Sequence, residues 1–102
     1  MKIYNKLVRD KIPEIIAADG KTCQTRVMDA EEYITALEEK LNEEVKEYQT
    51  DKNLEEMADV LEVLQAICVA RGYTIEELEQ MRAKKAEERG GFRERIWLEW
   101  VE

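Results

Sequence analysis

Two acidic motifs in the middle of the chain carry the clearest chemical signal. Residues 43–47 read Glu-Glu-Val-Lys-Glu and residues 56–59 read Glu-Met-Ala-Asp, each within a stretch whose apolar residues recur at helical spacing. Carboxylates three residues apart on a helix point to the same side, so each motif presents a pair. Two such pairs on adjacent antiparallel helices would form a four-carboxylate cluster. Such a cluster needs a cation, because buried carboxylates are costly and repel one another.

A helical wheel separates four carboxylates from the many other acidic residues of the chain. In the first stretch Glu44 falls inside the apolar arc and Glu47 lies at its edge, whereas Glu43 points to the polar side. In the second stretch Glu56 lies within the apolar arc and Asp59 at its margin. Oxygen-rich sites suit hard divalent ions, so we expect Glu44, Glu47, Glu56 and Asp59 to bind Mg²⁺.

Ordinary structural roles account for the same residues equally well at this stage. Glu56 occupies the third helical position after Asn53, where a capping box also places Glu. The glutamates of the first motif have Lys40 and Lys46 nearby as salt-bridge partners. Spacing alone therefore leaves a metal site and a set of caps and surface ion pairs open.

Basic residues suited to phosphate occur in two places. The helix that Thr74 opens continues its apolar stripe with cations that include Lys85 and Arg89, and the segment near the N-terminus contains Lys6 and Arg9. Arg contacts phosphate oxygens in a bidentate manner and Lys as a point charge. Compensation of the helix dipole and pairing with neighbouring Glu residues are the competing explanations.

Composition restricts the classes of partner and chemistry. The 102 residues carry a formal net charge of -8, which argues against nucleic acid or an acidic membrane surface as a partner. The absence of His removes His-based nucleophilic catalysis and the common His-containing metal sites. Of the two cysteines, Cys68 lies in an apolar run and is expected to be a buried thiol. The N-terminus lacks the apolar core of a signal peptide, so we expect a cytoplasmic protein.

Helix start and stop signals predict a single all-α domain over residues 1–102. A short helix is expected from about residue 9 or 11 to Gly20, and longer ones from Asp29 to about Gln49, from Asn53 to Arg71 and from Thr74 to Gly90. The short connector at residues 50–52 favours a bundle centred on a long antiparallel helix hairpin. Weak alternation also suggests short peripheral strands near residues 21–28 and 94–100.

The order of these motifs resembles the MazG-like all-α nucleoside triphosphate pyrophosphohydrolases. The resemblance covers nearly the whole chain and rests on residues 4–13, the acidic motifs at 43–47 and 56–59, and residues 85–92. It is nearest to the small single-domain house-cleaning branch, which is related to phosphoribosyl-ATP pyrophosphohydrolase.

The resemblance implies Mg²⁺-dependent hydrolysis of a nucleoside triphosphate, including non-standard ones, to a monophosphate and pyrophosphate. Mn²⁺ would be a substitute ion, and the active form would be a homodimer or higher homo-oligomer. The alternative is a regulatory module that binds nucleotide or metal without turnover. The implied catalytic residues are Glu43, Glu44, Glu47 and Lys85, and the implied phosphate-binding residues are Lys6, Arg9, Lys85 and Arg89.

Overall fold

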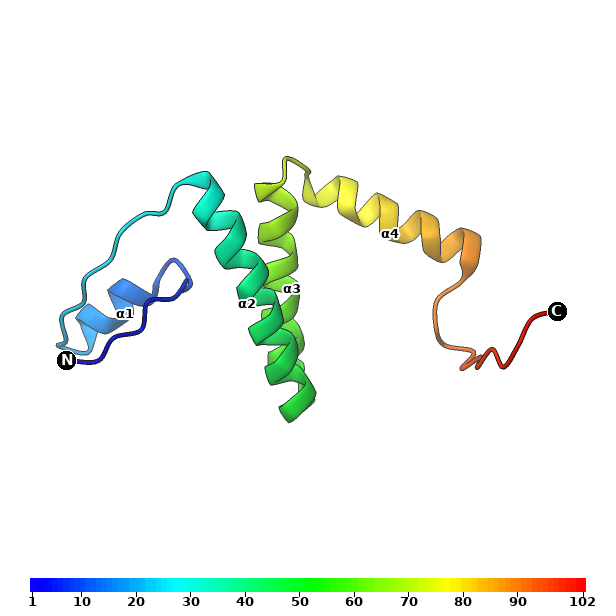
Figure 1. The fold of residues 1–102 in the computed structure, drawn as a ribbon, viewed down its shortest axis with the longest axis horizontal. Coiled ribbons are helices and arrows are strands. Elements are labelled where there is room, and N and C mark those ends of the chain that lie inside the picture. Colours follow the sequence, from blue (N-terminus) through cyan, green and yellow to red (C-terminus); the bar gives the residue numbers. More distant parts are fainter.

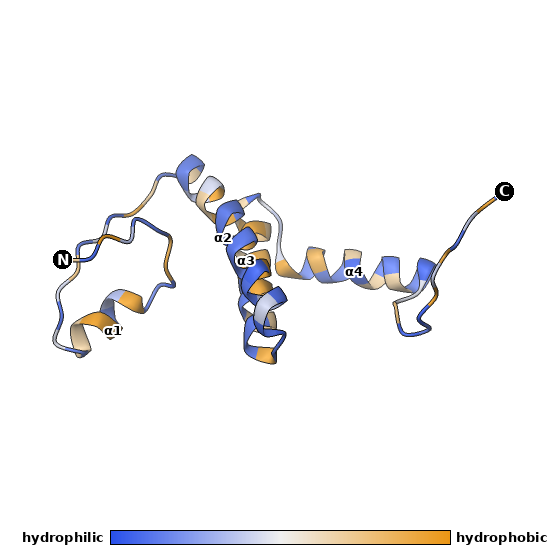
Figure 2. Ribbon diagram, turned by 60° about the horizontal axis from the view of Figure 1, so that its bottom comes forward, coloured by the Kyte–Doolittle hydropathy of each residue, from blue (hydrophilic) through white to orange (hydrophobic).

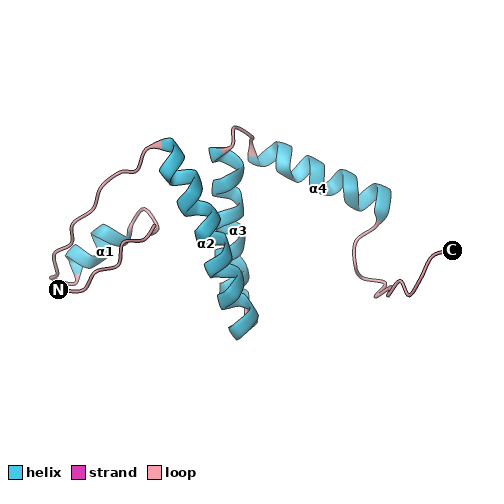
Figure 3. Ribbon diagram, viewed as in Figure 1, coloured by secondary structure: helices cyan, strands magenta, loops and turns pink.

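The computed structural model describes residues 1–102 and contains four helices and no strand (Figures 1 and 3). The expected all-α class is confirmed. None of the helices is both long enough and apolar enough to cross a bilayer. The helices are α1 (Ile12–Ala18), α2 (Ala30–Asp51), α3 (Leu54–Ala70) and α4 (Ile75–Arg89).

Side-chain caps fix where the three longer helices begin. The Asp29 carboxylate accepts a hydrogen bond from the Glu32 N–H at 2.9 Å and the Glu32 carboxylate accepts from the Asp29 N–H at 3.4 Å, which completes a capping box before α2. Thr74 and Glu77 form the same arrangement before α4. Asn53 caps α3. The helix starts therefore follow from local side-chain chemistry that the sequence displays.

Helices α2 and α3 form the centre of the fold. They lie side by side and run in opposite directions in Figure 1. Lys52 adopts a left-handed conformation with φ 50°, which ends α2 and reverses the chain within two residues. Few side chains are buried, and the apolar ones are Leu37 of α2 and Val63 and Cys68 of α3. The free thiol of Cys68 is buried as expected.

The remaining elements stand away from this pair. α4 contacts only α3, and α1 approaches no other helix (Figure 1). Figure 2 shows hydrophobic positions along α4 where the helix has no neighbour. The radius of gyration is 18.1 Å, whereas a compact domain of this length has one of about 13 Å. The single chain is therefore far more open than a self-contained monomer.

The expected strands near residues 21–28 and 94–100 are absent, so that expectation was wrong. Both segments have irregular backbone, and they lie on opposite sides of the α2–α3 pair (Figure 3). A strand requires a neighbouring strand for its backbone hydrogen bonds. Weak alternation in the sequence cannot supply that neighbour.

Candidate functional site

Glu44 is the centre of a carboxylate cluster between α2 and α3. Oxygen atoms of Glu44, Glu56 and Asp59 lie within 4.8 Å of one another, and so do oxygen atoms of Glu43, Glu44 and Glu47. The two groups share only Glu44. The structure thus brings the predicted ligands together as two overlapping triplets rather than as one set of four, because Glu47 is exposed at the rim.

Burial distinguishes Glu44 from the other acidic residues. Its side chain is only 6% exposed, and it is the one buried charged residue of the chain. Its Oε2 atom is buried without a hydrogen-bond partner. An unpartnered buried charge is unfavourable. Helix packing alone therefore does not explain this glutamate.

Glu56 does not use its carboxylate to cap α3. Its backbone N–H donates to the Asn53 side chain at 2.9 Å, but no hydrogen bond returns from the Glu56 carboxylate to the Asn53 N–H. Instead the Glu56 Oε2 atom is buried and unpartnered, as in Glu44. The capping explanation thus accounts for the Glu56 backbone and leaves its side chain available to the cluster.

The pKa values of Glu44 and Glu56 are both shifted upward, as expected for buried carboxyls. Burial raises the pKa of Glu44, the adjacent Glu47 carboxylate raises it further, and Lys40 acts in the opposite direction. Burial also raises the pKa of Glu56, and repulsion from Asp59 and other nearby carboxylates adds to that effect. In both residues the neutral, protonated form is therefore favoured more than in a solvated carboxyl.

Two basic side chains partly compensate the cluster. Lys40 Nζ lies 3.4 Å from Glu44 Oε1 and 3.5 Å from Glu43 Oε2. On the other side, the Arg9 guanidinium donates to Asp59 Oδ1 at 2.6 Å. The sequence indicated Lys40 only as an ordinary partner within its helix, and nothing in the spacing predicted that Arg9 would reach α3. Arg9, expected to bind phosphate, is here a counter-ion of an expected metal ligand.

The other expected phosphate contacts do not meet the cluster within one chain. Lys6 lies over the Tyr4 ring at 5.8 Å. Lys85 and Arg89 belong to the later turns of α4, which makes no contact with α2 and leads away from the helix pair (Figure 1). Glu56 and Asp59 lie in the first two turns of α3, at the opposite end from the start of α4.

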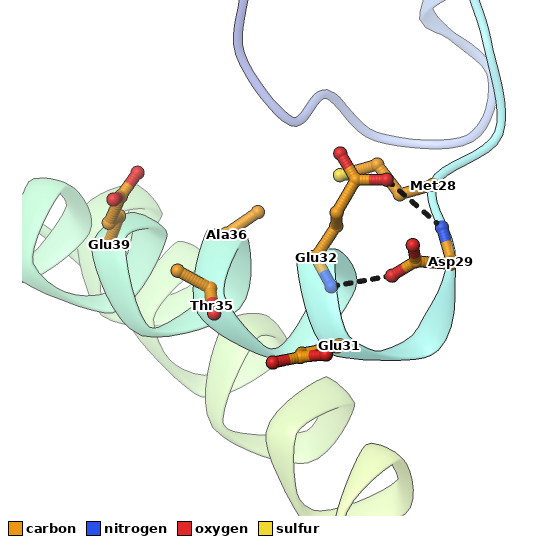
Figure 4. A pocket seen from close by; sticks show the side chains of 7 residues that line it. All are labelled: Met28, Asp29, Glu31, Glu32, Thr35, Ala36 and Glu39. Atoms are coloured by element: carbon orange, nitrogen blue, oxygen red, sulfur yellow. Dashed lines mark hydrogen bonds between the residues drawn. The ribbon is translucent and has the colours of Figure 1, made fainter.

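One depression of the surface lies away from this cluster. A shallow hollow of about 430 Å³ lies against the first turns of α2, and none of its lining residues belongs to the two triplets (Figure 4). Two of its carboxylates, Asp29 and Glu32, are engaged in the capping box, and Glu32 also pairs with Arg26 at 2.7 Å. The hollow is therefore the surface around a helix cap. The carboxylate cluster has the stronger claim to chemistry.

The donor set of the cluster fits a hard divalent cation. It offers carboxylate oxygens from two helices, and two of those oxygens are buried without partners. Mg²⁺ and Mn²⁺ prefer such oxygen ligands, whereas the set contains no nitrogen or sulfur donor that would favour zinc or copper. Glu44, Glu56 and Asp59 are the residues best arranged to hold an ion.

Comparisons with known proteins are limited to part of the chain. No family model and no solved structure matches it. A stretch of 42 residues is 52% identical to part of an uncharacterised protein of Mycolicibacterium smegmatis, and this match covers 41% of the chain and 43% of that protein. The aligned stretch spans less than half of this relative, and the name of the relative states no activity.

Proposed function

We propose that the chain is a Mg²⁺-dependent nucleoside triphosphate pyrophosphohydrolase that releases a nucleoside monophosphate and pyrophosphate. The observation that supports it most is the pair of buried, unpartnered oxygens on Glu44 and Glu56, two residues whose carboxylates cluster with that of Asp59. Clustered carboxylates from two helices are the ligands that a divalent ion uses in phosphate chemistry. The resemblance of the acidic motifs and their flanking segments to MazG-like enzymes supplies the reaction class.

Mg²⁺ held at this point would neutralise phosphate oxygens, orient the leaving pyrophosphate and lower the pKa of an attacking water. The side chains of the cluster have separable roles. Glu44, Glu56 and Asp59 hold the ion, with Glu47 as a further ligand at the exposed rim. Glu43 lies beside the buried ligand and is positioned by Lys40 at 3.5 Å, which suits a residue that orients water.

Basic residues would contact the phosphates around that ion. Lys6 and Arg9 lie on the N-terminal segment, and Arg9 already reaches Asp59. Lys85 and Arg89 lie on α4, which leads away from the cluster of its own chain. A phosphate-binding role for these two residues therefore requires a second copy of the chain, in line with the homo-oligomer that we propose.

Pyrophosphate release tests the proposal directly. The purified protein is incubated with Mg²⁺ and a panel of standard, deaminated, oxidised and methylated nucleoside triphosphates, with phosphoribosyl-ATP included. We expect release from at least one of them and its loss in Glu44→Gln and Asp59→Asn. Glu39→Gln, which changes an exposed α2 carboxylate outside both triplets, is the matched control and should retain activity.

Two results would contradict this function. Activity that survives both Glu44→Gln and Asp59→Asn would show that the cluster is not the catalytic site. Saturable nucleotide binding by calorimetry without product from any triphosphate would instead indicate a regulatory module that binds without turnover.

A further inference from the structure

The N-terminal segment is attached to the helix pair through one polar side chain. Residues 1–11, which we call the N-terminal strap, contain no helix or strand and lead into α1, which contacts no other helix. Among residues 1–25, only Arg9 forms a hydrogen bond or an ion pair with α2 or α3. The polar attachment of the strap therefore depends on this residue alone.

Arg9 is attached to a carboxylate of the candidate metal site. Its Nη2 atom donates to Asp59 Oδ1 at 2.6 Å, and its Nη1 atom lies 4.0 Å from Glu62 Oε1. Asp59 is one of the three residues of the triplet that spans both helices, whereas Glu62 belongs to neither triplet. The contact that holds the strap thus uses a group that a bound ion would also use.

The part of the strap next to Arg9 lies closest to the rest of the chain. Leu7 and Val8 are half-buried, whereas residues 1–6 are all exposed. In Figure 1 the loop between the N-terminus and α1 extends toward the α2–α3 pair. The peptide bond between Lys6 and Leu7 therefore lies at the border between the exposed and the covered part of the strap.

Charge draws the strap to the cluster, but only moderately. The strap contains four basic residues and one acidic residue, in a chain whose net charge is -8. The side chain of Arg9 is 56% exposed and that of Asp59 is 28% exposed. An ion pair between side chains this exposed gives at most a several-fold preference for the attached state. A more strongly bound cation can therefore displace the strap.

A divalent cation would compete with Arg9 for Asp59. Mg²⁺ binds carboxylate oxygens at about 2.0–2.1 Å, and two cations on one carboxylate repel each other. The other cation of the cluster, Lys40, lies 3.4 Å from Glu44 on the same helix, and its side chain is only 18% exposed. Helix α2 fixes Lys40 in place, whereas Arg9 belongs to irregular backbone. Arg9 is therefore the cation that leaves.

We infer that Arg9 fastens the N-terminal strap to Asp59 and that a divalent cation at the cluster releases it. Without the ion, the guanidinium supplies part of the positive charge that the cluster needs. Once released, Arg9 stays tethered to α2 through α1 and residues 19–29, and it becomes available to an anionic group such as a phosphate. The inference rests on the proposed metal site but not on hydrolysis, so it can be tested without nucleotide.

Two measurements on the full chain report the same release. Calorimetry with MgCl₂ gives an apparent Kd that is weakened by the fraction of chains whose strap is attached. A protease that cleaves after lysine gives a rate of cut at Lys6–Leu7, scored by mass spectrometry, that follows the fraction whose strap is released. We expect Mg²⁺ to accelerate this cut several-fold in the wild type, compared with EDTA at equal ionic strength.

Arg9→Gln should release the strap without an ion. Cleavage at Lys6–Leu7 should be several-fold faster than in the wild type in EDTA and should not respond to Mg²⁺. Mg²⁺ should bind more tightly by the same factor, because both gains equal the reciprocal of the released fraction. Lys11→Gln is the matched control: it removes the same charge from the strap at an exposed side chain that does not contact the cluster. This variant should behave like the wild type in both measurements.

Three results would overturn the inference. Mg²⁺ that binds without changing cleavage at Lys6–Leu7 in the wild type would show that the strap is not released, and would leave the metal site intact. Equal tightening of Mg²⁺ binding in Arg9→Gln and Lys11→Gln would show a general effect of charge. No binding of Mg²⁺ to the wild type would contradict the proposed metal site together with the strap.

Discussion

Replacing Glu44 by Gln should stabilise the metal-free protein, although it removes an ion pair. Glu44 Oε2 is buried without a partner, and such a group costs about 1–3 kcal/mol. The substitution keeps the side-chain shape and removes the charge. It also removes the attraction to Lys40 Nζ at 3.4 Å, but Lys40 keeps the Glu43 carboxylate at 3.5 Å as a partner. Because the charge is lost while a polar amide remains at the buried position, we expect a net gain of about 1 kcal/mol in the free energy of unfolding.

Magnesium should instead make the wild type more stable than the Glu44→Gln variant. For a domain of this length 1 kcal/mol corresponds to about 4–8 °C in Tm, so the variant should melt several degrees higher than wild type in EDTA. Saturating Mg²⁺ should stabilise the wild type by about 2.7 kcal/mol at a hundredfold excess over Kd, and the variant should not respond. Thermal melts with and without Mg²⁺, at one fixed protein concentration, measure both effects.

Glu55→Gln is the matched control, because this exposed α3 carboxylate belongs to neither triplet. This substitution should leave the Tm unchanged both in EDTA and in Mg²⁺. A Glu44→Gln variant that melts below wild type in EDTA and still responds to Mg²⁺ would refute the reasoning. In that case Glu44 would be a structural partner of Lys40.

Three further outcomes follow from the site. Without metal, unfolding free energy measured in urea should fall as pH rises above 4.5, because the raised pKa values of Glu44 and Glu56 make the folded state bind more protons than the unfolded state; a flat profile would contradict this cause. Arg9→Gln should tighten Mg²⁺ binding several-fold by calorimetry, since the guanidinium no longer holds Asp59; unchanged affinity would show that the two do not compete. If Arg89 acts across a dimer, mixing the inactive Glu44→Gln and Arg89→Gln variants should restore about one quarter of wild-type activity, because half of the dimers are mixed and each has one intact site of two. No recovery would mean that Arg89 acts within its own chain.

The sequence predicted the local parts of this fold well, because those parts depend on neighbouring residues. Asp29, Asn53 and Thr74 each accept a hydrogen bond from the backbone three residues later, as the capping patterns indicated. The helical wheel also identified Glu44 as the carboxylate that turns inward. Both inferences use the spacing of residues within one helix, which does not depend on how the rest of the chain folds.

Features that depend on segments distant in the chain could not be predicted from the sequence. Alternation near residues 21–28 and 94–100 suggested strands, but strand formation depends on a neighbour that neither segment has. The ion pair of Arg9 with Asp59 joins residues fifty positions apart, and no local pattern signals it. The wheel placed Glu47 beside Glu44 correctly, but it could not show that Glu47 stays at the exposed rim, outside the triplet that spans both helices.

Helix α3 carries two features that the fold of a single chain leaves unbalanced. One of its faces packs on α2 and brings Glu56 into an under-compensated acidic cluster, while the other face presents four apolar side chains to solvent. Either feature alone is costly for a chain with so small a buried core. Under the proposed function, Mg²⁺ would offset the first cost and another copy of the chain would cover the exposed apolar face. The proposed function therefore accounts for two features of α3 that the fold of one chain leaves unexplained.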